Sequence, residues 1–294
     1  MKVKRKPHWL AVKLGGGGEF PDVRRVLRKY RLHTVCEEAK CPNIGECWGE
    51  GTATFMILGD TCTRHCKFCA TRTGNPRGLV DEDEPERLRD AVSELGLDYV
   101  VITSVTRDDL PDGGASIFAR TVRLLKELPS PPRVELLIPD FRGDRAALEE
   151  VVGAGPDVVA HNLETVRRLT PIIRDRRASY DVSLEVLRLL KEIKLDLYTK
   201  SGLILGMGET RDEIIESHRD MRERGVDFVT MGQYLRPTLK HLPVDRFLTP
   251  DEFRELEEIA LSMGFLYAAS GPLVRSSYRA GEFFVQSLLK GRKG

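Results

Sequence analysis

The sequence predicts an α/β fold: a partial (βα)6 barrel of the TIM type, with an extension at its amino end and another at its carboxyl end. Six short apolar runs recur along the chain, and each has the length and composition of a strand buried on both faces of a parallel sheet. Each run is followed by a segment whose apolar residues recur at helical spacing. Six such units are fewer than the eight of a closed barrel, so we expect an incomplete barrel, with an open doubly wound sheet as the alternative.

The expected strands are short and rich in aliphatic residues. In chain order they cover residues 54–58, 99–102, 134–138, 158–160, 203–205 and 228–231. Three of the expected helices have clear start signals. Pro85 follows a run of four acidic residues, which favours the first turn of a helix. Thr210 with Glu213 and Thr249 with Glu252 form capping boxes. The other helices are expected near residues 23–30, 117–128, 148 and 184–190.

The chain divides into three expected parts. Residues 1–50 form an amino-terminal extension that holds the first group of cysteines, residues 51–264 form the partial barrel, and residues 265–294 form a carboxyl-terminal extension. Basic residues gather in the first extension between Arg24 and Arg31. This stretch is either a solvated helix face or a surface on which a partner docks.

The composition limits the classes of protein to which the chain can belong. A chain of 294 residues with 41% hydrophobic residues can bury a sizeable core. The 46 basic and 45 acidic residues nearly cancel, so the overall charge indicates no nucleic-acid partner. The apolar runs are too short to span a membrane, and the first residues lack the apolar stretch of a secretory signal. We therefore expect a cytoplasmic protein that binds neither nucleic acid nor a membrane.

All six cysteines lie in one short part of the chain, as two triplets. The first is Cys36-x4-Cys41-x5-Cys47 and the second is Cys62-x3-Cys66-x2-Cys69. Soft thiolates are the ligands that iron–sulfur clusters prefer, and a [4Fe–4S] cluster takes four of them. A triplet therefore leaves one iron open to another ligand, which is typical of a reactive site.

Two other uses of the six thiols are open. Disulfides would pair them, but this needs an oxidising compartment and is most common in small secreted chains. A structural zinc site needs four ligands around one ion and favours paired Cys-x2-Cys knuckles, of which the chain has only Cys66 and Cys69. Two clusters explain the spacing best.

The triplets are expected in different surroundings. The second follows the first strand and should therefore lie at the carboxyl ends of the parallel strands, where ligands bind in such sheets. The first lies in a stretch interrupted by Pro42 and Gly45, and we expect it in a loop outside the main core.

The spacing of the second triplet, with Phe68 before its last cysteine, resembles the motif of the radical S-adenosylmethionine (SAM) enzymes. The resemblance implies that Cys62, Cys66 and Cys69 hold a [4Fe–4S] cluster whose open iron binds SAM. Reduction of this cluster splits SAM into methionine and a 5′-deoxyadenosyl radical, which can remove hydrogen from a strong C–H bond.

Two further motifs narrow the resemblance to the lipoyl synthase family. They are the first triplet, over residues 36–48, and a carboxyl-terminal stretch over 271–280 that contains the sequence Arg275-Ser276-Ser277-Tyr278. Residues 103–115, 161–165, 200–210 and 233–238 are also similar to this family, so the resemblance extends from about residue 6 to about residue 280.

The resemblance to lipoyl synthases implies the following reaction. Two sulfur atoms are inserted at C6 and C8 of an octanoyl chain that is linked to a lysine of a carrier domain, and each insertion uses one SAM. Cys36, Cys41 and Cys47 hold an auxiliary [4Fe–4S] cluster that gives up its sulfur. Its fourth ligand is a serine of the carboxyl-terminal motif, Ser276 or Ser277, and we favour Ser277.

The same resemblance implies partners. These are octanoylated lipoyl domains of 2-oxoacid dehydrogenase E2 subunits, the H protein of glycine cleavage, an electron donor such as ferredoxin or flavodoxin, and iron–sulfur carrier proteins.

Six residues are candidate contacts of SAM. Asn162 and Glu164 follow the fourth strand and could bind ribose hydroxyls, and Arg174 could pair with the SAM carboxylate. Gly206, Gly208 and Glu209 follow the fifth strand, where missing side chains would allow a close approach of the cofactor. The alternatives are ordinary polar surface residues for the first three and a tight turn for the glycines.

Two alternative functions remain beside the leading one. Another sulfur-inserting radical SAM enzyme, such as a biotin synthase or a methylthiotransferase, would explain the second triplet alone. A two-cluster electron carrier would explain both triplets, but such carriers are compact, and this chain continues for more than two hundred residues after its last cysteine.

Overall fold

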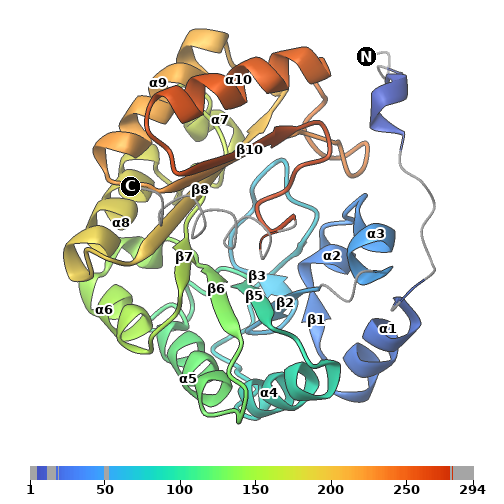
Figure 1. The fold of residues 1–294 in the computed structure, drawn as a ribbon, viewed down its shortest axis with the longest axis vertical. Coiled ribbons are helices and arrows are strands. Elements are labelled where there is room, and N and C mark those ends of the chain that lie inside the picture. Colours follow the sequence, from blue (N-terminus) through green and yellow to red (C-terminus); the bar gives the residue numbers. More distant parts are fainter. Residues whose placement is uncertain (1–4, 12–17, 19, 50–52, 279, 281–294) are drawn as a thin grey trace.

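In the computed structural model, which describes residues 5–11, 18, 20–49, 53–278 and 280, an eight-stranded sheet forms the centre of the molecule (Figure 1). The strand order is β1-β2-β5-β6-β7-β8-β9-β10. All neighbouring strands are parallel except β1 and β2. The strands are β1 (His33–Thr34), β2 (Thr54–Ile57), β5 (Tyr99–Ser104), β6 (Arg133–Leu137), β7 (Val158–Ala160), β8 (Tyr198–Leu205), β9 (Phe228–Gln233) and β10 (Tyr267–Gly271).

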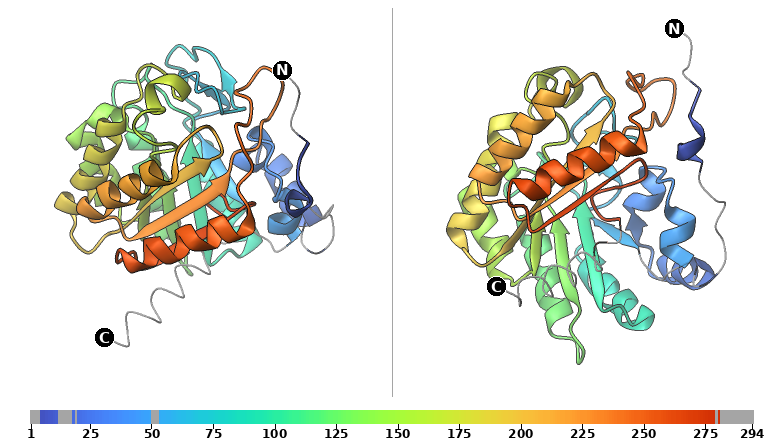
Figure 2. Two further views of the ribbon diagram at one scale, coloured as in Figure 1. Left: turned by 90° about the horizontal axis from the view of Figure 1, so that it is seen from above. Right: turned by 45° about the horizontal axis from the view of Figure 1, so that its top comes forward.

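Helices cover the outer side of this curved sheet, so the predicted partial barrel is confirmed (Figures 1 and 2). Both predicted capping boxes form, with Thr210 and Glu213 at the start of α9 and Thr249 and Glu252 at the start of α10. The outer helices are α4 (Glu84–Leu95), α5 (Ala115–Lys126), α6 (Arg145–Gly153), α8 (Tyr180–Ile193), α9 (Arg211–Glu223) and α10 (Pro250–Ser262).

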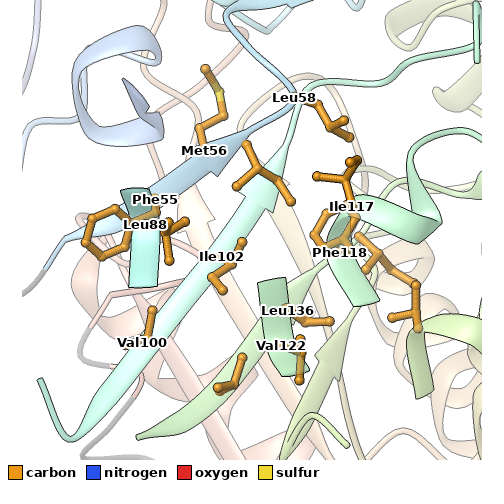
Figure 3. Packing of buried hydrophobic residues seen from close by; sticks show 14 of the residues in the cluster. Phe55, Met56, Leu58, Leu88, Val100, Ile102, Ile117, Phe118, Val122 and Leu136 are labelled. Carbon is orange, nitrogen blue, oxygen red and sulfur yellow. The ribbon is translucent and has the colours of Figure 1, made fainter. Parts of the chain in front are cut away.

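The main core lies between the strands and these helices. Phe55 of β2 and Ile102 of β5 are fully buried against Leu88 of α4, and Phe118 of α5 packs beside them (Figure 3). Apolar side chains of each strand thus face the helices. The opposite side of the strands carries buried polar groups, such as the ion pair of Lys200 and Glu135 at 2.7 Å.

The observed strands differ from the predicted ones in two places. Strand β8 begins at Tyr198, five residues before the predicted start at residue 203, because its first half contains Thr199, Lys200 and Ser201 instead of an apolar run. Strand β10 adds a parallel strand beyond the six that were predicted. It consists mostly of small residues, and it begins within the part that we assigned to a carboxyl-terminal extension from residue 265.

The amino-terminal part packs on the barrel through three helices, α1 (Phe20–Lys29), α2 (Val35–Glu38) and α3 (Ile44–Gly49). The expectation that the first cysteine triplet lies in a loop outside the core was wrong for two of its residues. Cys47 lies in α3. Cys36 lies in α2 and belongs to the main core cluster. The physical reason is local capping: the side chain of Thr34 accepts a hydrogen bond from the backbone N–H of Glu37 and begins a helix there.

The remaining short elements are η1 (His8–Leu10), β3 (Thr61–Cys62), β4 (Arg72–Thr73), η2 (Phe141–Gly143) and α7 (Thr170–Ile173). Parts of both predicted extensions, including residues 50–52, 279 and 281–294, lie outside the described residues. Among the helices of the described chain, none is long and apolar enough to cross a membrane.

Candidate functional site

The second cysteine triplet lies in a loop at the carboxyl ends of the strands, as predicted. Its first cysteine, Cys62, ends β3, which pairs with β4 in a small parallel sheet. The backbone N–H of Thr63 donates to the carbonyl oxygen of Thr106, just after β5, at 2.9 Å. At the other end of the loop, Nε2 of His241 lies 2.9 Å from the carbonyl oxygen of Cys69. Residues that follow several strands therefore hold this loop in place.

The middle of the loop is fixed through the backbone of Lys67. Its N–H donates to the carbonyl oxygen of Ile173 in α7 at 2.8 Å, and its carbonyl oxygen accepts from the N–H of Leu242 at 3.0 Å. Lys67 is thus clamped between α7 and the segment that follows β9. Because both backbone groups are satisfied, the turn between Cys66 and Cys69 has a defined shape.

Arg64 anchors the first half of the loop, a role that the sequence did not reveal. Its buried guanidinium donates to both carboxylate oxygens of Asp108 at 2.9 Å and to those of Asp140 at 2.5 and 2.8 Å. These bidentate, charge-assisted bonds tie the cysteine loop to the segments after β5 and β6. The partners are 44 and 76 residues away, so sequence reasoning could use only the presence of an arginine between two cysteines.

The thiols of the second triplet receive backbone donors. The N–H of Asp175 lies 3.3 Å from Sγ of Cys66, and the N–H of Arg64 lies 3.4 Å from Sγ of Cys62. Burial raises the pKa of the Cys66 thiol to about 11 and raises that of Cys69, because a thiolate is costly away from water. Iron cations would supply the positive charge that keeps such buried thiols deprotonated, so this donor set fits a cluster.

Three of the predicted SAM-binding residues gather beside this triplet. Nδ2 of Asn162 donates to Oε1 of Glu164 at 3.2 Å, and the Glu164 carboxylate lies close enough to Cys66, Cys69 and Arg174 to interact with their charges. Burial raises the pKa of Glu164, and the Arg174 guanidinium acts against this.

The same three residues carry signs of a ligand site. Glu164 has a left-handed backbone, with φ of 67°, which is strained for a residue other than glycine. Within the described chain, Oδ1 of Asn162 and Nε of Arg174 are buried without a hydrogen-bond partner. Buried polar atoms of this kind are costly unless a partner satisfies them, and the polar groups of SAM are of the right kind.

In the turn after β8, the side chain of Glu209, a candidate SAM contact, is bonded to the backbone of the turn itself. The Glu209 carboxylate accepts hydrogen bonds from the backbone N–H groups of Gly206 at 2.5 Å and Met207 at 3.0 Å, so it closes its own turn. A Cβ at Gly206 would lie 2.2 Å from Nε2 of Gln233, and packing therefore requires glycine there. Gly208 has φ of 109° and faces open space, and contact of this turn with SAM remains a prediction.

The first triplet is packed against the carboxyl-terminal motif. Nδ2 of Asn43, between Cys41 and Cys47, donates to the carbonyl oxygen of Leu273 at 2.7 Å. The hydroxyl of Tyr278 donates to Oε1 of Glu46 at 2.7 Å. These contacts join segments that are more than 220 residues apart in the chain.

Both serines of the motif are candidate ligands, and the structure places Ser277 next to the surroundings of Cys36. Oγ1 of Thr54 donates to the hydroxyl oxygen of Ser277 at 2.8 Å. Burial raises the pKa of the Cys36 thiol, and the backbone N–H of the same Thr54 acts against this. The Ser276 hydroxyl makes no hydrogen bond within the residues that the structure describes.

Arg275 adds a positive charge beside the first triplet. Burial raises the pKa of the Cys41 thiol, and the Arg275 guanidinium and the backbone N–H of Asn43 act against it. The segment of Arg275 passes directly over β9, where Gly232 makes room: a Cβ there would lie 2.0 Å from the carbonyl oxygen of Val274. No pattern in the sequence indicated the role of Gly232.

The two alternatives for the thiols find no support here. All six cysteines are free. Among the described residues, no group of three or more His, Cys, Asp or Glu side chains is placed to bind one metal ion, as a zinc site requires. The thiolates of an iron–sulfur cluster each bind a different iron and therefore lie farther apart than the ligands of one ion.

The basic stretch of α1 is largely paired with acids of the same chain. Arg25 and Lys29 both contact Glu94, at 2.8 and 2.5 Å, and Arg28 contacts Glu37 at 3.2 Å. These exposed pairs reduce the positive charge that the stretch presents. Its use as a docking surface remains a prediction, and the structure gives it little support.

Comparison with known proteins agrees with this site. The sequence profile of the radical SAM superfamily matches residues 56–221, and the profile of the N-terminal domain of lipoyl synthase matches residues 1–41. The chain is 58% identical over 284 residues to a lipoyl synthase of Pyrobaculum arsenaticum, covering 96% of each chain. It is 55% identical to one of Thermus thermophilus, covering 97% of this chain and 88% of the relative.

Solved structures share the fold at much lower identity. The [FeFe]-hydrogenase maturase HydG of Carboxydothermus hydrogenoformans is 14% identical with a TM-score of 0.57, over 85% of this chain and 56% of that one. Methylornithine synthase is 20% identical with a TM-score of 0.51, over 79% of this chain and 68% of that one. The fold, the two profiles and the near full-length relatives lead to one conclusion: the chain belongs to the lipoyl synthase family of radical SAM enzymes.

Proposed function

We propose that this enzyme inserts two sulfur atoms, at C6 and C8, into an octanoyl chain that is amide-linked to a lysine of a lipoyl carrier domain. The observation that carries the proposal is the contact between the first cysteine triplet and the carboxyl-terminal motif, through Asn43 with Leu273 and Glu46 with Tyr278. A radical SAM enzyme without a second cluster has no need of such a contact. The same pair of motifs occurs in a chain that is 52–58% identical to lipoyl synthases over nearly its full length.

Two [4Fe–4S] clusters and SAM are the cofactors of the proposal. Cys62, Cys66 and Cys69 would hold the first cluster, and Cys36, Cys41, Cys47 and Ser277 would hold the second. Once bound, the first supplies the electron that cleaves SAM into a 5′-deoxyadenosyl radical, and the second supplies the sulfur atoms.

The protein's own residues then have distinct tasks. Asn162 presents a buried, unpartnered Oδ1 beside the second triplet, and with the neighbouring, partly buried Glu164 carboxylate it would orient the ribose of SAM. The unpaired Nε of Arg174 would donate to the SAM carboxylate. A hydroxyl at Ser277 is a harder and weaker iron ligand than a thiolate, which suits a cluster that must come apart during turnover.

We place the reaction in the cytoplasm, because free buried thiols of this kind persist in a reducing compartment. The carrier partners would be lipoyl domains of E2 subunits or the H protein of glycine cleavage. Ferredoxin or flavodoxin would deliver electrons, and iron–sulfur carrier proteins would rebuild the consumed cluster.

Exchange of one cysteine in each triplet tests the proposal. With an octanoylated lysine peptide under anaerobic conditions, Cys36→Ala should still release 5′-deoxyadenosine but form no carbon–sulfur bond. Cys66→Ala should release none, because the cluster that binds SAM loses a ligand. Mass spectrometry of the peptide and chromatography of the nucleoside separate the two results.

Iron content is the control for both variants. Fully loaded protein should contain about eight irons per chain, and each variant about four, if each triplet holds its own [4Fe–4S] cluster. Equal loss of nucleoside release in both variants would contradict a separate sulfur-donating site. Release without sulfur insertion by the fully loaded protein would point to a different radical SAM reaction.

A further inference from the structure

The cysteine loop has an inner and an outer side. On the inner side, the thiols of Cys66 and Cys69 interact with the charge of the partly buried Glu164 carboxylate. On the outer side, Lys67, two residues before Cys69, is exposed to solvent. At this turn, the second triplet is therefore separated from solvent only by residues of the loop itself.

Two other segments are hydrogen-bonded to the backbone of Lys67, and each carries exposed residues close in sequence to that bond. The bonds to Ile173 and Leu242 join Lys67 to α7 and to the segment after β9. On the α7 side, Ile172 is 51% exposed, and on the other side Leu239 is 73% exposed. We call this surface the Lys67 patch and define it by Lys67, Ile172, Arg176, Leu239 and Lys240. Figure 2 shows the three segments together at one end of the molecule.

The Lys67 patch carries unbalanced positive charge. Lys67, Arg176 and Lys240 are exposed, and within the described residues none of them forms an ion pair. Asp175, which precedes Arg176, is buried and already paired: it bonds to Arg177 at 2.9 Å, and its carboxylate also accepts from the backbone N–H of His65. A chain whose net charge is only +1 thus presents cations at this spot without matching anions.

We propose that the Lys67 patch is the docking surface for an acidic one-electron carrier protein that reduces the cluster of the second triplet. This inference rests on the proposed function, because only a cluster at this triplet needs an external electron. One electron would leave the reduced centre of the carrier for each SAM cleaved, with no bond made or broken between the proteins. Small, charge-complementary contacts with a few apolar residues are typical of such electron-transfer encounters.

The geometry favours an electron carrier over the octanoylated domain. An acyl chain must reach the space between the two triplets, but both backbone groups of Lys67 are bonded to its neighbours and close the loop at the patch. An electron can cross this turn, whereas an acyl chain cannot. The exposed Ile172 and Leu239 would add apolar contact to the electrostatic attraction.

Charge reversal away from the cluster ligands tests the proposal. We compare the double variant Arg176→Glu/Lys240→Glu with Arg123→Glu/Arg219→Glu, which makes the same charge change at exposed positions on α5 and α9. The probe is a purified acidic flavodoxin, whose binding to each cluster-loaded protein is measured by fluorescence anisotropy at several salt concentrations. The rate of 5′-deoxyadenosine release is measured with the reduced flavodoxin and, separately, with dithionite.

The patch variant should bind flavodoxin at least about tenfold more weakly than the unaltered protein, and the difference should shrink as salt rises. Its release rate with flavodoxin should fall by a similar factor, while the rate with dithionite stays within about twofold. The variant of α5 and α9 should change neither the binding nor the rates.

Three results would overturn the proposal. Equal flavodoxin binding by the patch variant and the unaltered protein would show that the carrier docks elsewhere. Equal weakening in the α5 and α9 variant would show an effect of overall charge alone. A patch variant that binds flavodoxin normally but uses octanoylated carrier domain poorly would assign this surface to the substrate. Failure of the proposed function is separate, since the unaltered protein would then release no nucleoside with dithionite.

Discussion

Oγ1 of Thr54 donates a hydrogen bond of 2.8 Å to the hydroxyl of Ser277, 223 residues later in the chain. Thr54 begins β2, and its backbone N–H acts on the Cys36 thiol. One residue of the barrel therefore joins the first cysteine triplet to the carboxyl-terminal serine. This relationship distinguishes Ser277 from its neighbour Ser276.

Exchange of the two serines should therefore give different results. Ser277→Ala should abolish sulfur insertion but keep at least about seven of the roughly eight irons per chain, because three cysteines still hold the second cluster and only its fourth iron loses a protein ligand. Release of 5′-deoxyadenosine should persist. Ser276→Ala is the matched control and should retain both iron and product. Normal sulfur insertion by Ser277→Ala, together with its loss in Ser276→Ala, would exchange the assignments.

Substitution at Gly232 should act on the same site from a distance. A Cβ there would lie 2.0 Å from the carbonyl oxygen of Val274, so Gly232→Ala should push the segment of Arg275 and Ser277 away from the first triplet. We expect loss of sulfur insertion, with SAM cleavage and most of the iron retained. Gly153→Ala, at the end of α6, has no neighbour within 4 Å of the added Cβ and serves as control. Normal lipoyl product from Gly232→Ala would show that the segment can shift without consequence.

Removal of the Arg64 guanidinium should destabilise the protein strongly. Arg64→Met leaves the carboxylates of Asp108 and Asp140 near each other without their shared cation, and breaking a buried ion pair in this way costs about 3–5 kcal/mol. Arg64→Lys keeps the charge but loses the bidentate geometry, so its free energy of unfolding should lie between those of Arg64→Met and the unaltered protein. Urea denaturation of the anaerobic proteins measures the free energy of unfolding.

The matched control for Arg64 is Arg72 in the same region. Arg72 pairs with Asp60 at 3.2 Å on the surface, so Arg72→Met should cost less than about 1 kcal/mol. Similar losses in Arg72→Met and Arg64→Met would refute the anchoring role of Arg64.

Acid should destabilise the fold through His218. Burial lowers the pKa of this imidazole to about 4, and within the described residues neither ring nitrogen has a hydrogen-bond partner. The folded protein holds it neutral, whereas the unfolded chain protonates it near pH 6.5, so stability present above that pH is lost as the pH falls toward 4. Between pH 7 and pH 5 this amounts to about 2 kcal/mol.

His218→Phe isolates this contribution. The variant keeps a ring beside Phe265, which the His218 ring meets at 5.9 Å between centroids, but it has no group to protonate. The unfolding free energy of the variant should therefore fall about 2 kcal/mol less than that of the unaltered protein between pH 7 and pH 5. Parallel pH dependence in the two proteins would show that His218 is not responsible.

Local patterns in the sequence determined much of this protein. Apolar runs of strand length, the capping boxes at Thr210 and Thr249 and the two cysteine triplets depend on neighbouring residues, so they could be identified without a structure. The resemblance to lipoyl synthases came from motifs of the same local kind. Strand β10 escaped prediction because its small residues have no apolar periodicity, and it forms only because β9 offers a parallel edge.

The tertiary structure alone decided which distant residues meet. No local pattern joins Arg64 to Asp140, Thr54 to Ser277 or Gly232 to Val274, since each pair lies more than 40 residues apart. The path of the barrel brings these segments together. Their contacts hold the second cysteine triplet at the carboxyl ends of the strands and the first triplet against the carboxyl-terminal motif. The sequence thus determined which chemical groups the enzyme has, and the fold determined which of them act together.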